Sequence, residues 1–108
     1  MSNIYATLGQ VLSTASTLTD LYTVPSSTNT VASSLVVCNQ GVTATFRVAV
    51  RKVGASIDPK QYLIYDMVIN ANDTISLALG ITLAQTDVVS VYASSSTISF
   101  NLFGTELI

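Results

Sequence analysis

The sequence predicts an all-β protein, a single antiparallel β-sandwich of seven or eight strands, and a jelly roll is one arrangement such strands permit. Three observations lead to this prediction. Apolar residues recur at period two, turn-forming residues separate the apolar segments, and these segments recur roughly every ten to thirteen residues. The length of 108 residues fits one domain, which we expect to span residues 1–108.

The period-two alternation is clearest in residues 45–51, 74–79, 89–94 and 98–102. In these segments the larger apolar side chains occupy every second position, as Phe46, Val48 and Val50 do. In a β-strand such positions share one face, so this face is expected to pack in the core and the other to meet solvent. The shared pattern favours strands over helices.

Turn residues set the boundaries of the expected strands. Gly, Pro, Asn, Asp and Ser recur where the backbone should reverse, at residues 25–29, 39–41, 54–59, 70–73, 85–87 and 94–97. Residues 25–29 should form a turn, residues 39–41 should close a hairpin, and residues 54–59 should form a wider loop. The seven expected strands are residues 18–24, 30–39, 43–53, 62–69, 74–79, 89–94 and 98–102, and residues 4–12 would add an eighth if they form a strand. Residues 1–16 are then an N-terminal arm or an edge strand, and residues 13–17 belong to a connection.

The small number of charged residues argues against several classes of function. Four Lys and Arg residues against six Asp and Glu residues give a net charge of −2, and charged residues make up 9% of the chain. Nucleic acids and anionic membranes are bound through clusters of Lys and Arg, so we expect neither as a partner. The longest uncharged run, residues 21–46, contains a polar stretch unsuited to a transmembrane helix. No basic region opens the N-terminus, which predicts synthesis in the cytoplasm without a signal peptide.

Cys38 and the absence of histidine bear on catalysis and metal binding. A single cysteine permits neither an intrachain disulfide nor a multi-cysteine zinc site, and histidine is the usual general base and metal ligand. Cys38 follows an apolar run and is interpreted as a buried core thiol, because free cysteine is often buried. Residues 70–73 offer oxygen ligands but lack the closing glutamate of a calcium loop, and are interpreted as a turn. We expect no cofactor and no metal.

The carboxylates are the remaining candidates for catalysis. They are Asp20, Asp66 and Glu106 and, within expected turns, Asp58, Asp73 and Asp87. A pair of carboxylates could cleave a glycosidic bond, with Asp66 as one member because it lies inside an expected strand. Asp66 could equally face solvent, pair with Arg47 or Arg51, or lie in a subunit contact. A carboxylate in a turn is explained by hydrogen bonds from backbone N–H groups. The sequence therefore predicts no catalytic residues and no enzyme.

Three tyrosines, Tyr62, Tyr65 and Tyr92, could present aromatic rings to a sugar. Tyr62 and Tyr65 are three positions apart, so on a regular strand their side chains would point to opposite faces. This spacing argues against a shared aromatic platform. It favours tyrosines that flank the core or an interface.

The low charge also suggests that the protein assembles. Soluble monomers normally carry charged side chains that keep them soluble and protect their sheet edges. Here Ser and Thr, 28 of the 108 residues, supply most of the polarity instead. Interface cores are depleted in charge, so the composition favours a homo-oligomer, a trimer or larger, over a hydroxyl-rich monomer.

The sequence resembles small structural proteins of tailed bacteriophages, notably cyanophages. The resemblance is carried by residues 21–25 (LYTVP), 34–39 (SLVVCN), 46–51 (FRVAVR), 62–66 (YLIYD), 72–74 (NDT), 79–83 (LGITL), 86–89 (TDVV) and 99–104 (SFNLFG). It spans nearly the whole chain from about residue 7 and consists mostly of strands and turns. Such proteins are described as virion proteins, sometimes as associated with the tail fibre. The resemblance implies a non-enzymatic component of a virus particle, and it brings no site residues with it.

These observations lead to one main expectation and two alternatives. The main expectation is a capsid decoration (cement) protein or a small neck or tail accessory in the virion, whose partners are itself and other virion proteins such as the major capsid protein or a tail or neck protein. The C-terminal run, residues 99–108, could then pair with a neighbour by strand addition. The alternatives are a receptor- or glycan-binding module displayed on the virion, and a small hydrolase that acts through Asp66.

Overall fold

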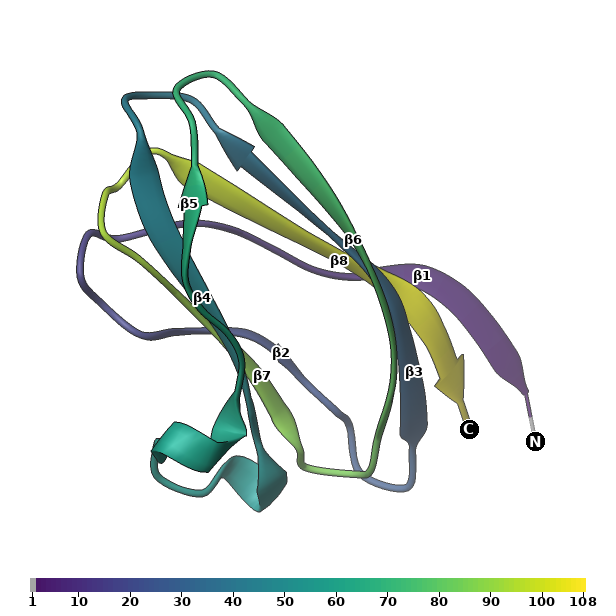
Figure 1. Ribbon diagram of the computed structural model, residues 1–108. Coiled ribbons are helices and arrows are strands. Elements are labelled where there is room, and N and C mark those ends of the chain that lie inside the picture. The colour runs from purple at the N-terminus through teal and green to yellow at the C-terminus, as the bar shows by residue number, and fades with distance from the viewer. Residues whose placement is uncertain (1) are drawn as a thin grey trace.

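The computed structural model describes residues 2–108, which form eight strands and two short 3-10 helices (Figure 1). The strands are β1 (Asn3–Leu12), β2 (Thr19–Thr23), β3 (Asn29–Asn39), β4 (Ala44–Arg51), β5 (Tyr62–Ile69), β6 (Thr74–Leu83), β7 (Val88–Ala93) and β8 (Ile98–Leu107). The helices η1 (Lys52–Gly54) and η2 (Pro59–Gln61) lie in the loop between β4 and β5. A strand lies at each of the seven expected places, and residues 3–12 form the eighth. The described residues include no helix that is long and apolar enough to cross a membrane.

The strands form two antiparallel sheets that pack face to face as a β-sandwich (Figure 1). Sheet A has the order β1-β8-β3-β6 and sheet B the order β2-β7-β4-β5. The first strand pairs with the last, the second with the seventh, the third with the sixth and the fourth with the fifth. This pairing results when one long antiparallel hairpin is rolled up, which is the topology of a jelly roll.

One connection and the pairing of the last strand differ from those expected. Residues 39–41 do not close a hairpin, because β3 belongs to sheet A and β4 to sheet B. The expectation that residues 99–108 pair with a neighbour by strand addition is also wrong. The strand β8 lies between β1 and β3 and is hydrogen-bonded on both sides, so it presents no free edge.

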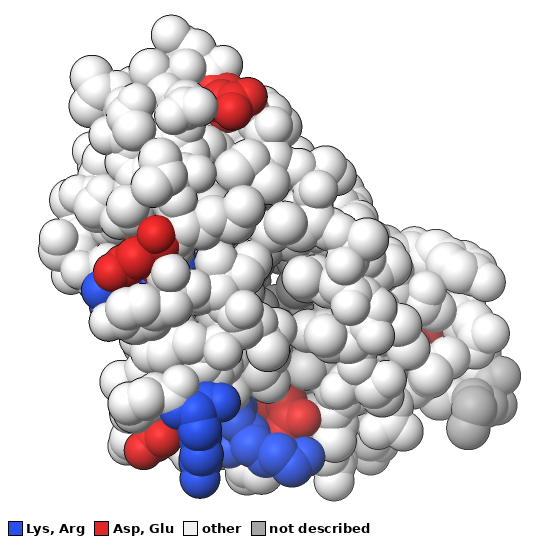
Figure 2. Space-filling view, viewed as in Figure 1, with Lys and Arg blue, Asp and Glu red and all other residues white. Residues whose placement is uncertain are grey.

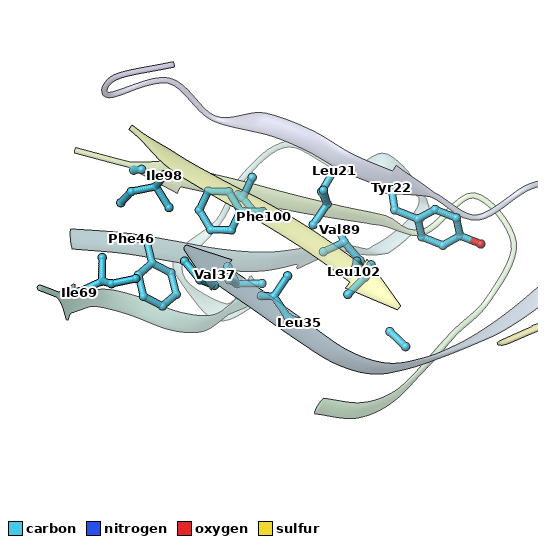
Figure 3. Packing of buried hydrophobic residues seen from close by; sticks show 14 of the residues in the cluster. Leu21, Tyr22, Leu35, Val37, Phe46, Ile69, Val89, Ile98, Phe100 and Leu102 are labelled. Atoms are coloured by element: carbon cyan, nitrogen blue, oxygen red, sulfur yellow. The ribbon is translucent and has the colours of Figure 1, made fainter. Parts of the chain in front are cut away.

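The inward-facing side chains of both sheets form one apolar core (Figure 3). Phe46 of β4 and Phe100 of β8 meet at its centre edge to face, with ring centroids 6.0 Å apart. Both side chains are fully buried, as are Leu35 and Val37 of β3. Because each sheet contributes every second residue, the period-two pattern of the sequence corresponds directly to this core.

Cys38 is not part of this core. Its neighbours Val37 and Asn39 point inward, so Cys38 points to the outer face of sheet A, where it is half-buried. The apolar run before Cys38 suggested a core thiol, but strand alternation determines which of these side chains is buried.

Glu106 of β8 also points inward, although it is charged. The hydroxyl of Tyr22 donates a hydrogen bond of 2.6 Å to Glu106 Oε2 and lies 2.8 Å from Thr30 Oγ1. Burial and the hydrogen bond to Glu106 raise the pKa of Tyr22 to about 12. The carboxylate of Glu106 therefore lies between the two sheets, where it accepts the hydrogen bond from Tyr22, and not on the outer face of sheet A.

Candidate functional site

The outer face of sheet B brings three tyrosines together around one arginine. The rings of Tyr62 and Tyr65 lie edge to face, with centroids 5.0 Å apart and an interplanar angle of 81°. The expectation that these two side chains point to opposite faces is therefore wrong. Tyr92 of β7 lies opposite Arg47 in the neighbouring strand and completes the group.

Two irregularities of β5 determine which of its side chains point to the outer face of sheet B. Phe46 pairs with Met67 and Val48 with Ile64, so β5 carries an extra residue between these pairs. Asp66, with a φ of 52°, adopts the left-handed conformation that an aspartate tolerates better than most residues. Each extra residue reverses the alternation, and a second one separates Ile64 from Tyr62, which pairs with Ala49. Ile64 consequently packs on the core while Tyr62 and Tyr65 share the outer face.

Arg47 is the centre of this group. Its guanidinium carbon lies 4.2 Å from the ring centroid of Tyr65 and 4.4 Å from that of Tyr92, so it stacks on both rings. Its Nε donates a hydrogen bond of 2.6 Å to Asp66 Oδ1, and its Nη2 lies 3.3 Å from Asp66 Oδ2. This two-pronged hydrogen bond to Asp66 raises the pKa of Arg47 above its ordinary value. Of the roles open to Asp66, the structure shows pairing with Arg47.

A pocket of about 550 Å³ lies beside Tyr62 and Tyr65. Its other walls are Ile57, Asp58 and Pro59, in the loop that leads to β5. Asp58 caps η2, because its Oδ1 accepts the N–H of Lys60 while its own N–H donates to Gln61 Oε1. Gln61 Nε2 also donates to the Ser56 carbonyl at 3.2 Å, so hydrogen bonds define the loop wall of the pocket.

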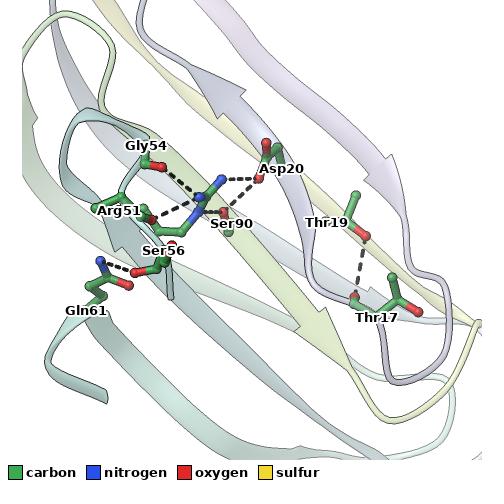
Figure 4. A network of polar contacts seen from close by, with 9 residues as sticks. Thr17, Thr19, Asp20, Arg51, Gly54, Ser56, Gln61 and Ser90 are labelled. Atoms are coloured by element: carbon green, nitrogen blue, oxygen red, sulfur yellow. Dashed lines mark hydrogen bonds and ion pairs between the residues drawn. The ribbon is translucent and has the colours of Figure 1, made fainter. Parts of the chain in front are cut away.

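Arg51 ties the same loop to sheet B (Figure 4). Its Nη1 donates to the carbonyls of Gly54 and Ala55, at 3.1 and 3.0 Å. Its Nε and Nη2 donate to the hydroxyl of Ser90 and to Asp20, at 3.0 and 2.8 Å. The guanidinium therefore connects the loop with β7 and β2, which rigidifies the approach to the pocket.

Asp87 anchors the beginning of the same loop. It is 3% exposed, and its two oxygens accept hydrogen bonds of 2.9 Å from the N–H groups of Val53 and Ala84. Lys52 Nζ lies 3.8 Å from the same carboxylate. Burial by itself would raise the pKa of Asp87, but the two N–H groups and Lys52 together hold it below its ordinary value.

We expect stability to depend on pH through Asp87. Because its folded pKa lies below its unfolded value of about 3.9, its contribution is present above that pH and is lost as the pH falls through the folded pKa. Urea unfolding between about pH 2.5 and pH 7 should show this loss. Asp87→Asn should lower the free energy of unfolding at pH 7 by about 1–3 kcal/mol and reduce the acid dependence. An unchanged acid dependence in the variant would contradict this role.

The other turn carboxylates behave as the sequence indicated. Asp58 accepts the N–H of Lys60, and Asp73 accepts the N–H of Thr74 at 2.9 Å. Residues 70–73 form the turn between β5 and β6. Within residues 2–108, no three His, Cys, Asp or Glu side chains gather to hold a metal ion.

Charge is distributed unevenly between the two sheets (Figure 2). The four Lys and Arg residues lie on β4 or in the loop after it, and Figure 2 shows most of this charge at the lower left. The strands of sheet A contain a single charged residue, Glu106, which points inward to Tyr22. The outer face of sheet A, which we call the neutral face, therefore carries no charge. Its members include Tyr5, Gln10, Leu12, Val36, Cys38, Ser76, Ala78, Ser99, Asn101 and Phe103.

Comparison with protein-family models and with curated proteins finds no match to this chain. The jelly-roll fold, the pocket beside Tyr62 and Tyr65 and the neutral face are thus the features on which a functional argument can rest.

Proposed function

We propose that the protein is a non-enzymatic structural component of a tailed-phage virion, a capsid decoration protein or a small neck or tail accessory. It would act through symmetric contacts with copies of itself and with other virion proteins. The observation that carries this proposal is the neutral face, which spans four strands without a charged side chain. The resemblance of strand and turn segments to phage virion proteins supplies the context.

The neutral face suits a second copy of the same chain. A neighbouring copy can contact this face without repulsion between like charges and without burying an unpaired charge. Hydroxyl and amide groups, such as Ser99 and Asn101, can hydrogen-bond across the contact, while Tyr5 and Leu12 supply apolar area. Tyr5 is 81% exposed and Leu12 57% exposed in the single chain. Burial of such side chains favours association.

The edges of sheet A support the same conclusion. Its outermost strands, β1 and β6, contain no Lys, Arg, Asp or Glu. Edge strands of monomers are commonly protected from pairing with another chain by charged side chains. Edges without this protection are expected where neighbouring copies cover them. A symmetric assembly repeats each modest contact, so that the total stabilisation becomes large.

A charge placed on the neutral face should disrupt self-association. We expect Ser99→Lys, on the inner strand β8 of this face, to raise the dissociation constant of the oligomer about tenfold or more, because the contact would bury an unpaired ammonium group. Thr45→Lys, on the outer face of sheet B, is the matched control and should leave association unchanged. Sedimentation velocity over a range of concentrations measures both. Equal effects of the two substitutions, or none from Ser99→Lys, would exclude the neutral face as the interface.

A further inference from the structure

We propose that the pocket beside Tyr62 and Tyr65 binds a neutral sugar, such as one hexopyranose unit of a surface glycan. The pocket volume of about 550 Å³ lies within the range of roughly 300–1,000 Å³ found for small-molecule sites. This inference goes beyond the structural role proposed above and does not depend on it, because the pocket and the neutral face belong to different sheets.

Two aromatic rings shape the pocket as a corner. Because the rings of Tyr62 and Tyr65 are inclined by 81°, they form two walls that meet, not one flat platform. The C–H groups of a pyranose ring can pack on the electron-rich face of one tyrosine while the edge of the other limits its position. Tyr65 is 60% exposed and Ile57 is 42% exposed, so a bound ligand would stay partly in water. That suits a hydroxyl-rich ligand better than a wholly apolar one.

Asp58 supplies a hydrogen-bond acceptor at the same pocket. Its Oδ1 accepts the N–H of Lys60, and the hydrogen bonds within residues 2–108 leave its Oδ2 without a donor. A free carboxylate oxygen is a strong acceptor for sugar hydroxyls. Because the capping bonds hold the Asp58 backbone, this acceptor is already in place before a ligand arrives.

The charges around the pocket favour a neutral ligand. The nearby cation, Arg47, is neutralised by Asp66 and stacks on Tyr65. Asp58 is the charged group that lines the pocket, so an acidic sugar would be repelled. A quaternary ammonium ligand would be attracted by Asp58 and the rings, but it would have to approach a tyrosine that already stacks on a cation.

The pocket is held rigid from several sides. Arg51 and Asp87 fix residues 53–55, Gln61 fixes Ser56, and Arg47 with Asp66 holds Tyr65. A preorganised site loses less entropy on binding, which matters for the weak contacts that one sugar can make.

NMR titration of the ¹⁵N-labelled full chain tests the proposal. Lactose, maltose and cellobiose are the neutral probes, glucuronate is the acidic probe and choline the cationic one. We expect at least one neutral sugar to give saturable shift changes confined to residues 56–66, with a dissociation constant on the order of 1 mM. Choline and glucuronate should bind about tenfold more weakly or not at all.

Three variants separate the contacts. Tyr65→Ala should weaken sugar binding about tenfold or more, whereas Tyr65→Phe should keep most of it because the ring remains. Tyr5→Ala, which removes an exposed tyrosine of sheet A, is the matched control and should have no effect. Asp58→Asn preserves the helix cap, so it should weaken a neutral sugar only severalfold.

Several results would overturn the proposal. They are the absence of saturable shifts at residues 56–66 with all three neutral sugars, preferential binding of choline or glucuronate there, or equal losses in Tyr65→Ala and Tyr5→Ala. The Ser99→Lys variant should bind the sugar as the original protein does. Failure of self-association and failure of sugar binding are therefore distinguishable.

Discussion

Replacement of Phe100 by alanine should lower the free energy of unfolding by about 3–5 kcal/mol, the loss typical of a large aromatic side chain removed from a packed core. Phe100 is fully buried and meets Phe46 across the two sheets, with ring centroids 6.0 Å apart. The cavity would lie where β8 of sheet A faces β4 of sheet B, so the contact between the sheets would weaken directly. Denaturant unfolding at neutral pH measures the change.

Phe103 offers a matched control on the same strand. Its side chain alternates with the core and is only partly buried, so Phe103→Ala should cost clearly less. Because Phe103 lies on the neutral face, both variants should be compared at concentrations where the protein is monomeric. Equal losses in the two variants would contradict the assignment of Phe100 to the inner face.

Asn39→Ala should destabilise the fold by about 3 kcal/mol or more, because it leaves several buried polar groups without partners. Asn39 is 1% exposed and lies where the turns at one end of the sandwich converge. Its amide donates to the carbonyls of Val42, Ile69 and Asn70 and accepts from the N–H of Gly41 and the hydroxyl of Thr97. One side chain thus joins the connections that follow β3, β5 and β7.

Asn101→Ala provides the comparison for this substitution. Asn101 accepts a hydrogen bond of 2.7 Å from Gln10 on the outer face of sheet A, where water can replace the lost partner. We expect this variant to lose less than about 1 kcal/mol in the same unfolding experiment. A loss in Asn39→Ala as small as that in Asn101→Ala would mean that the turns are held without the amide.

The strands could be predicted from the sequence, but their pairing could not. Alternation of Phe46, Val48 and Val50 shows which side chains face inward, because the period of a strand depends only on local geometry. Which strand lies beside which depends on contacts between distant segments, such as β1 with β8. Turn residues alone therefore suggested a hairpin at residues 39–41, where the chain actually passes from one sheet to the other.

The pocket could be predicted only in part from the sequence. Tyr62, Tyr65 and Tyr92 could be named as candidates, but regular alternation placed Tyr62 and Tyr65 on opposite faces. The irregularity that turns Tyr62 to the face of Tyr65 lies between Tyr62 and Ile64, where no residue of the sequence signals it. Asp66, in the left-handed conformation, marks only the other irregularity of β5. Ile57 and Pro59 had no such signal, because their place in the pocket depends on how the loop folds back.

The uneven distribution of charge could be recognised only after the strands were assigned to the two sheets. Composition shows that charged residues are few, and it led to the expectation of assembly. That Glu106 is the one charged residue of sheet A follows only once β1, β3, β6 and β8 are known to share a sheet. The same fold turns Glu106 inward to Tyr22 and leaves the outer face without charge.

Light scattering of the purified protein on a sizing column, over a wide range of concentrations, tests most directly whether copies of the protein associate. We predict a stable homo-oligomer, a trimer or larger, over most of this range, and dissociation to the monomer only at the lowest concentrations. A protein that remains a strict monomer at every concentration would contradict the proposed self-association.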